Sequence, residues 1–127
     1  MNVPEHLQYT RDHEWAEVTG PRVKVGVTDY AQDALGDVVF VQVPTIGQVV
    51  QVGMTFSEIE STKSVSDVYA PVSGTVVEVN TELSEAPQKI NEDPYGAGWL
   101  CVIEAQEPTA SLEHFLDAGA YRSLVGE

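Results

Sequence analysis

The sequence predicts a mainly β protein, folded as a sandwich or a barrel. Its extended runs are short and rich in valine, and the run 22–27 alternates in residue type, as a half-buried strand does. Proline and glycine fall between the runs, where they provide turn dihedrals and interrupt strand ladders. Many short strands with frequent turns are typical of sandwiches and barrels. The expected strands, in chain order, are 22–27, 38–43, 49–52, 55–60, 65–69, 75–79 and 99–104.

A helix is expected directly after the first of these strands. Thr28 is a favourable N-cap, because its hydroxyl can accept a hydrogen bond from the first turn. Asp29 suits the positive end of the helix dipole, and Gly36 is a typical C-terminal stop. These signals predict a helix that ends at Leu35.

The C-terminal tail is expected to form a second helix, over about 109–125. Leu112, Phe115 and Leu116 stand at helical spacing, which places them on one face. No long repeat, low-complexity tract or linker divides the sequence, and a length of 127 residues suits one core. We therefore expect a single domain over 1–127.

Charge excludes several kinds of partner. Twenty acidic residues against six Lys and Arg give a formal charge of −14, which is the wrong sign for binding nucleic acid or an anionic membrane surface. No apolar run approaches the roughly 18 residues that a membrane span needs. The segment 1–15 lacks the basic and apolar regions of a secretory signal, so the cytoplasm is the expected compartment.

Several residues that can carry chemistry have no suitable partner in the sequence. His13 and Glu14 begin like a zincin helix, but Glu17 stands where the second histidine is needed, and no Cys/His spacing supports a metal site. The single cysteine, Cys101, lies between apolar neighbours and is expected to be a buried, inert thiol.

Two pairs of carboxylates two residues apart would share one face of an extended chain, as an acid–base pair might. These pairs are Asp12 with Glu14 and Glu58 with Glu60. Solvated surface acids explain both pairs better, and we expect no catalytic dyad.

Lys63 differs from the other charged residues because of its surroundings in the sequence. It is the only cationic residue between Lys24 and Lys89, a stretch that holds nine acids. It also lies at the centre of a hairpin expected over 58–69, where Ser and Thr residues would form the turn. An exposed amine on a rigid tip is what a modifying enzyme needs, although a solvated turn lysine would look the same.

Four segments resemble the lipoyl-carrying H protein family of the glycine cleavage system. ESTKSVSDVYAPVSGTVVEVN (60–80) is similar to the family's lipoyl-lysine segment, with Lys63 at the modified position. YTRDHEW (9–15), VGVTDYAQDALGDVVFVQVP (25–44) and INEDPYGAGWL (90–100) resemble its other signatures, in the same order. The resemblance implies a lipoyl/biotinyl-type barrel-sandwich hybrid of two antiparallel sheets with short flanking helices.

The resemblance also implies a function. Members of this family are substrate carriers without turnover of their own, and lipoate in amide linkage to the lysine is their swinging arm. The arm receives the aminomethyl group of glycine from a pyridoxal-phosphate glycine decarboxylase, delivers it to a tetrahydrofolate-dependent aminomethyltransferase, and is reoxidised by dihydrolipoyl dehydrogenase. Enzymes that transfer lipoyl or octanoyl groups are the remaining expected partners, and a monomer is the expected state.

In the family the loaded arm folds back into a surface cleft that keeps water away from the adduct. Glu14 and Asp67 match positions implicated near this cleft, where a carboxylate could hold the adduct's ammonium group. Ala34 stands where some members carry histidine or another polar residue, so no polar contact is expected from it.

Other readings remain open from the sequence. Biotin carriers also modify a hairpin lysine but place Met on both sides of it, whereas Thr62 and Ser64 flank Lys63. Lipoyl domains of 2-oxo-acid dehydrogenase complexes usually belong to longer chains and lack the HEW and DPYGAGW segments. A lipoyl relay donor and an unmodified interaction module are the remaining alternatives. On the favoured reading, the chain is one lipoyl-carrier domain whose lipoyl hairpin covers about 55–70.

Overall fold

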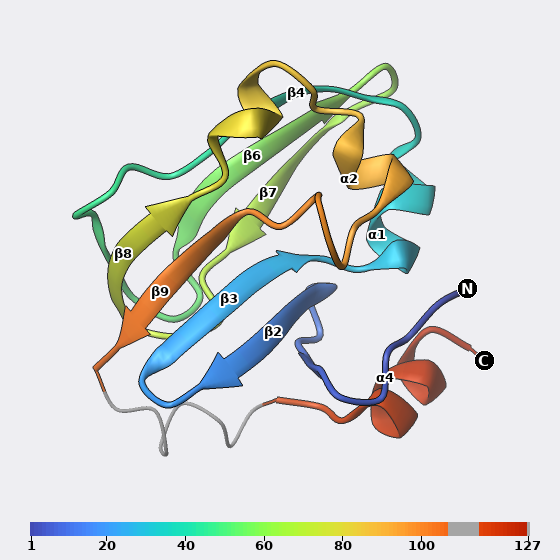
Figure 1. The fold of residues 1–127 in the computed structure, drawn as a ribbon. Helices are drawn as coiled ribbons and strands as arrows, with labels where there is room; N and C mark the ends of the chain where they lie inside the picture. Colours follow the sequence, from blue (N-terminus) through green and yellow to red (C-terminus); the bar gives the residue numbers. More distant parts are fainter. Residues whose placement is uncertain (107–114, 127) are drawn as a thin grey trace.

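The computed structural model describes residues 1–106 and 115–126 and shows two antiparallel sheets with short helices around them (Figure 1). The larger sheet has the strand order β1-β2-β3-β9-β8-β5, and the smaller has the order β4-β6-β7. The predicted mainly β class with two antiparallel sheets is therefore confirmed. The strands are β1 (Gln8–Tyr9), β2 (Glu14–Thr19), β3 (Arg22–Val27), β4 (Val38–Gln42), β5 (Val49–Val50), β6 (Thr55–Ser61), β7 (Val65–Tyr69), β8 (Gly74–Val79) and β9 (Cys101–Ala105).

All seven expected strands are present, with small differences at their ends. The sequence pattern missed β1 and β2, the two strands at one edge of the larger sheet. In β2, Glu14 is buried beside Trp15, so the strand does not show the polar-out alternation that predicts a strand. β1 is only two residues long, which is too short for any periodic signal.

Helix α1 (Asp29–Leu35) forms as expected. The Thr28 hydroxyl accepts a hydrogen bond from the Ala31 backbone at 3.2 Å. Gly36 ends the helix at φ +79°, a conformation that side chains with a Cβ rarely adopt, while its N–H donates to the Gln32 carbonyl. Two further short helices, η1 (Thr81–Ser84) and α2 (Lys89–Glu92), follow β8 and were not expected.

The described part of the tail contains a helix that is shorter than the one expected over 109–125. Residues 109–114 of that range lie outside the described part of the chain, and α4 covers only Ala118–Leu124. Leu116 is extended instead, because its N–H and carbonyl exchange hydrogen bonds of 2.7 and 2.8 Å with the backbone of Tyr9. Asp117 then caps α4 by accepting from the Ala120 N–H at 2.8 Å. The expected helix is therefore wrong for residues 115–117 and confirmed for Ala118–Leu124.

The two sheets pack against each other over a core rich in valine, isoleucine and leucine. Cys101 belongs to this core, which confirms the expected buried cysteine, and burial raises the pKa of its thiol to about 12. A second, aromatic cluster joins the N-terminal segment and β2 to α4, with the rings of Tyr9 and Tyr121 stacked at 4.8 Å. None of the described helices is long and apolar enough to cross a membrane.

Candidate functional site

The hairpin of β6 and β7 presents Lys63 at its tip. Ser61 closes the turn, because its backbone N–H donates to the Ser64 carbonyl at 2.8 Å and its hydroxyl accepts from the N–H groups of Lys63 and Ser64. The Lys63 side chain is exposed. The expectation that small hydroxyl residues shape this turn is thus confirmed for Ser61.

The turn is also attached to the end of α1. The Thr62 N–H donates to the Asp37 carbonyl at 3.0 Å, and the Lys63 side chain passes over Gly36. The positive φ of Gly36 disfavours any side chain at this position, and a Cβ here would lie 3.0 Å from Lys63 Cε, so the lysine stem would have to shift.

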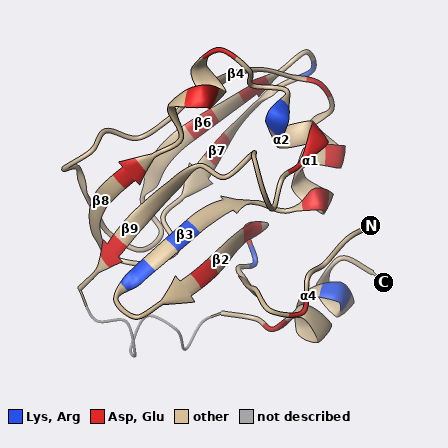
Figure 2. Ribbon diagram, in the orientation of Figure 1, with Lys and Arg blue, Asp and Glu red and all other residues tan. Residues whose placement is uncertain are grey.

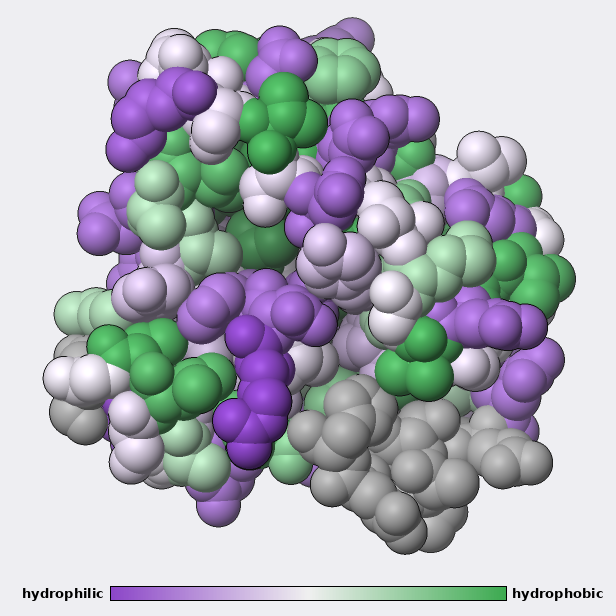
Figure 3. Space-filling model, turned by 180° about the vertical axis from the view of Figure 1, so that it is seen from behind, coloured by the Kyte–Doolittle hydropathy of each residue, from purple (hydrophilic) through white to green (hydrophobic). Residues whose placement is uncertain are grey.

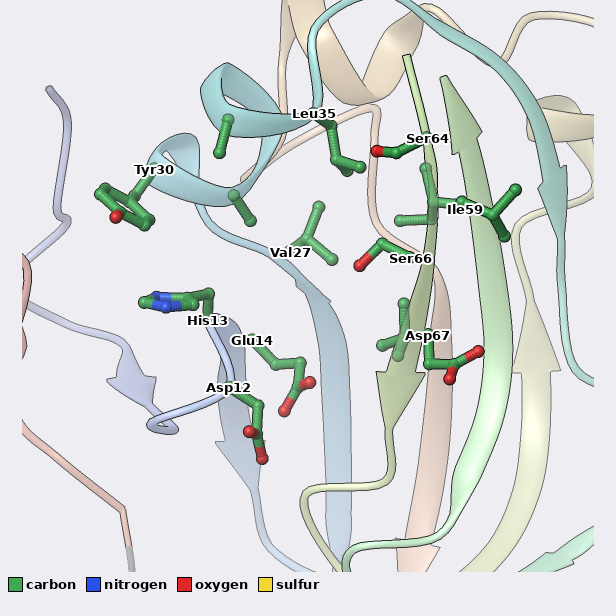
Figure 4. A pocket seen from close by; sticks show the side chains of 14 residues that line it. Asp12, His13, Glu14, Val27, Tyr30, Leu35, Ile59, Ser64, Ser66 and Asp67 are labelled. Carbon is green, nitrogen blue, oxygen red and sulfur yellow. The ribbon is translucent and has the colours of Figure 1, made fainter. Parts of the chain in front are cut away.

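A cavity of about 300 Å³ lies beside this hairpin, between α1, β7 and the start of β2 (Figure 4). Apolar side chains, among them Val27, Leu35 and Val68, form much of its wall. Glu14 and Asp67, which come from different sheets, both line it, and so does Ala34. The full lining is Asp12, His13, Glu14, Val27, Tyr30, Ala31, Ala34, Leu35, Ile59, Ser64, Val65, Ser66, Asp67 and Val68.

Glu14 is the buried acid of this cavity, with 2% of its surface exposed. Its carboxylate accepts from the Thr10 hydroxyl at 2.7 Å and from the Tyr69 N–H at 3.2 Å. Burial raises its pKa to about 7, the charge of Asp12 adds to the rise, and the two hydrogen bonds oppose it. The expectation of a solvated acid was wrong for Glu14, because Thr10 and Tyr69 take the place of water.

Asp67 lies at the rim and differs from Glu14 in its surroundings. It is exposed, and it stands directly opposite Glu58 in the ladder between β6 and β7. Figure 4 shows its carboxyl group turned away from that of Glu14. The remaining members of the two acid pairs, Asp12, Glu58 and Glu60, are exposed, as expected for surface acids.

His13 lines the same cavity and was not expected there. The His13 backbone adopts a positive φ of 69°. Its Nδ1 lies 2.8 Å from the Tyr121 hydroxyl, which in turn lies 2.8 Å from Thr28 Oγ1. Its ring packs 4.7 Å from that of Tyr30, and burial lowers its pKa, which favours the neutral imidazole. Sequence spacing gives no sign of this contact, because Tyr121 is 108 residues away.

Glu14 should make the stability of the protein depend on pH. Its pKa rises from an ordinary 4.5 to about 7 on folding, so the folded state binds its proton more tightly than the unfolded chain. The contribution of Glu14 to the free energy of unfolding should therefore fall as the pH rises from about 4.5 to about 7, by at most about 3 kcal/mol, and then level off. Urea unfolding of wild type and Glu14→Gln across this range measures it.

The difference between the two proteins isolates this residue, since all other titrating groups are shared. The wild type should lose stability relative to Glu14→Gln as the pH rises through the window. Parallel stability curves for the two proteins would show that Glu14 ionises normally in the folded state.

Fold and site together define a class of protein. Two packed antiparallel sheets, with an exposed lysine on a tight hairpin beside a cleft, form a barrel-sandwich hybrid of the lipoyl- and biotinyl-carrier type. The described residues hold no group of three or more His, Cys, Asp or Glu side chains that could bind a metal ion.

Comparison with known proteins identifies the family. The family model for the glycine cleavage H-protein matches residues 7–127. The glycine cleavage system H protein of Anaeromyxobacter sp. (strain K) is 52% identical, and the match covers 100% of this chain and 98% of that protein. The glycine cleavage system H protein of Thermus thermophilus is 47% identical, and the match covers 98% of this chain and 97% of that protein. A crystal structure of the H protein from Mycobacterium marinum superposes with a TM-score of 0.90 at 43% identity, covering 98% of this chain and 100% of that one.

The chain therefore belongs to the glycine cleavage H-protein family. The resemblance stated from the sequence and the expected barrel-sandwich fold are both confirmed.

Proposed function

We propose that the protein is the lipoyl-bearing carrier of a glycine cleavage system, with lipoate in amide linkage to Lys63. In this role it takes the aminomethyl group from glycine decarboxylase to the aminomethyltransferase and is reoxidised by dihydrolipoyl dehydrogenase. One observation carries the proposal: an exposed lysine on a rigid turn adjoins a cavity that contains a buried carboxylate, Glu14. A carrier needs both a point of attachment and a place to keep its cargo.

The residues around Lys63 fit a long alkyl arm. Gly36 leaves the path of the lysine stem open, and the cavity beside the turn has apolar walls. Bound lipoate would supply a strained dithiolane ring, which opens readily because a five-membered ring cannot reach the roughly 90° disulfide dihedral. The protein supplies a fixed root for the arm and a partly dry surface on which it can rest.

Glu14 is the group we propose for holding the cargo. An aminomethyl group carries an ammonium ion, and its arrival beside Glu14 would favour the ionised carboxylate over the protonated one. The Thr10 hydroxyl and the Tyr69 N–H already hold the carboxylate in place. The cavity walls would keep water from the loaded arm, which protects an amine and a sulfur on one carbon from hydrolysis.

Intact mass spectrometry tests the attachment. After growth with isotope-labelled octanoate or lipoate, the protein should carry one labelled lipoyl group, located on Lys63 by peptide mapping. A biotinyl mass, or a chain that stays unmodified in cells that lipoylate other proteins, would contradict the proposal. Transfer of an aminomethyl group from glycine, measured with purified partner enzymes, separates a glycine cleavage carrier from a lipoyl relay.

Charge is expected to bring this carrier to its partners. Acidic positions lie on α1, β6 and β7, around the hairpin whose one basic residue is Lys63 (Figure 2). On the face that Figure 3 shows, the described hydrophobic residues stand in separate groups among hydrophilic ones. The acidic surroundings of the hairpin favour electrostatic steering toward a basic rim on a partner.

Steering of this kind should weaken with salt. We expect the KM of the decarboxylase for the carrier to rise between 0.1 M and 1 M salt, as the Debye length falls from about 10 Å to about 3 Å. Turnover at saturating carrier should change less. Steady-state kinetics at several salt concentrations measures both, and a KM independent of salt would indicate apolar docking instead.

A further inference from the structure

Residues 36–38, which lead from the end of α1 into the first residue of β4, are held from one side by Asn91 of α2. The Asn91 side-chain NH₂ donates to the Gly36 carbonyl at 2.8 Å and to Gln32 Oε1 at 3.0 Å. Its carbonyl oxygen accepts from the Val38 N–H at 2.9 Å. One half-buried amide therefore satisfies backbone groups on both sides of Asp37.

The other side of the same segment carries the lysine turn. The Thr62 N–H donates to the Asp37 carbonyl at 3.0 Å, and Val38 pairs with Ser61 in the ladder of β4 and β6. The Lys63 side chain lies across Gly36, next to the part of α1 that lines the cavity. Asn91 and the Lys63 turn thus contact opposite sides of three consecutive residues.

We propose that Asn91 is a positioning residue for Lys63. By fixing residues 36–38, it holds the Asp37 carbonyl where Thr62 binds it, and this bond sets the direction in which the lysine leaves the turn. A lipoyl-transferring enzyme must bring this amine to its reactive group, so a turn with several orientations makes fewer productive encounters. The effect on modification rests on the function proposed above, whereas the effect on the turn does not.

The chain offers a matched control in Asn80. Its side-chain NH₂ also donates to two backbone carbonyls, those of Ala97 and Trp99, both at 2.8 Å, and its oxygen accepts from the Glu82 N–H at 3.3 Å. Asn80 is more deeply buried than Asn91, so its loss should cost at least as much stability. Its bonds lead to residues 82, 97 and 99 and not to the turn.

The experiment compares Asn91→Ala, Asn91→Asp and Asn80→Ala with the wild type, all as unmodified full-length protein. Initial rates of lipoyl attachment are measured against carrier concentration, and backbone hydrogen exchange is measured at Thr62 and Ser61. Asn91→Asp keeps the oxygen that accepts from the Val38 N–H and the shape of the side chain, but it removes the NH₂ donor. This variant replaces Asn91→Ala in the comparison if the alanine variant does not fold.

For either Asn91 variant we expect the KM for lipoyl attachment to rise about tenfold, while kcat changes less than about twofold. Hydrogen exchange at the Thr62 backbone N–H should become about tenfold faster. Ser61, whose N–H bonds within the turn, should exchange as in the wild type. Asn80→Ala should leave KM and Thr62 exchange unchanged.

Two results would overturn the proposal. One is a wild-type KM and wild-type Thr62 exchange in folded Asn91 variants. The other is an equal change in Asn80→Ala, which would assign the effect to general loss of stability. If the wild type itself accepts no lipoyl group, the proposed function fails, and Thr62 exchange alone then decides whether Asn91 positions the turn.

Discussion

Replacing Lys63 with arginine is expected to abolish lipoate attachment and glycine cleavage while the fold stays intact. Arginine keeps the positive charge, but its guanidinium does not lose a proton in proteins and offers no amine that can be acylated. The bonds that close the turn use backbone groups and the Ser61 hydroxyl, so the exposed side chain at position 63 contributes little to stability. We expect the free energy of unfolding to change by no more than about 0.5 kcal/mol.

Reconstituted glycine decarboxylation and intact mass measure the two losses, and urea unfolding measures stability. Lys89→Arg, the same exchange on α2, is the matched control and should keep both modification and activity. Glycine cleavage by Lys63→Arg at the wild-type rate would contradict the assignment of Lys63.

The second large effect is expected at Glu14. Glu14→Gln should leave modification of Lys63 nearly unchanged but speed hydrolysis of the aminomethyl-loaded protein, because the loaded arm then spends more time in water. Loss of a buried charge-assisted hydrogen bond is worth roughly 1.5 to 3 kcal/mol, which corresponds to about a tenfold or greater change in the ratio of docked to free arm. Release of formaldehyde and ammonia, without aminomethyltransferase, is the measurement.

Asp67→Asn provides the comparison within the same cavity. Asp67 is exposed, and its carboxyl group is turned away from Glu14, so water screens any contact with the cargo. We therefore expect a much smaller rise in hydrolysis for Asp67→Asn than for Glu14→Gln. Equal release from Glu14→Gln and wild type, with both proteins folded, would show that other residues protect the adduct.

Local sequence signals predicted the elements that depend on local chemistry. Thr28 and Gly36 bound α1 as their capping preferences indicate, and the valine-rich runs form the expected strands. The start of α4 could not be predicted in this way. Leu116 has helical spacing, but its partner is Tyr9, at the other end of the chain, and backbone pairing with a distant strand outweighs local pattern.

For the candidate site, too, the sequence predicts some features, whereas others depend on contacts between distant parts of the chain. The charge pattern alone set Lys63 apart, and the resemblance to a family supplied Glu14 and Asp67 as cleft residues. Neither the charge pattern nor the family resemblance predicts that Glu14 is buried and Asp67 exposed. That difference depends on Thr10, Tyr69 and the packing of one sheet on the other. His13 was missed for the same reason, since its contact with Tyr121 exists only in the folded chain.

Strand β7 connects the Lys63 turn to the Glu14 carboxylate, and its length sets the distance between them. The turn that carries Lys63 precedes its first residue, Val65, and the N–H of its last residue, Tyr69, holds the Glu14 carboxylate. At about 3.3 Å per residue, each residue of β7 sets how far an arm rooted at the turn must reach to meet that carboxylate. One residue more or fewer would change this reach and also turn Ser66 and Val68 to the opposite face of the sheet, so arm length and strand length must agree.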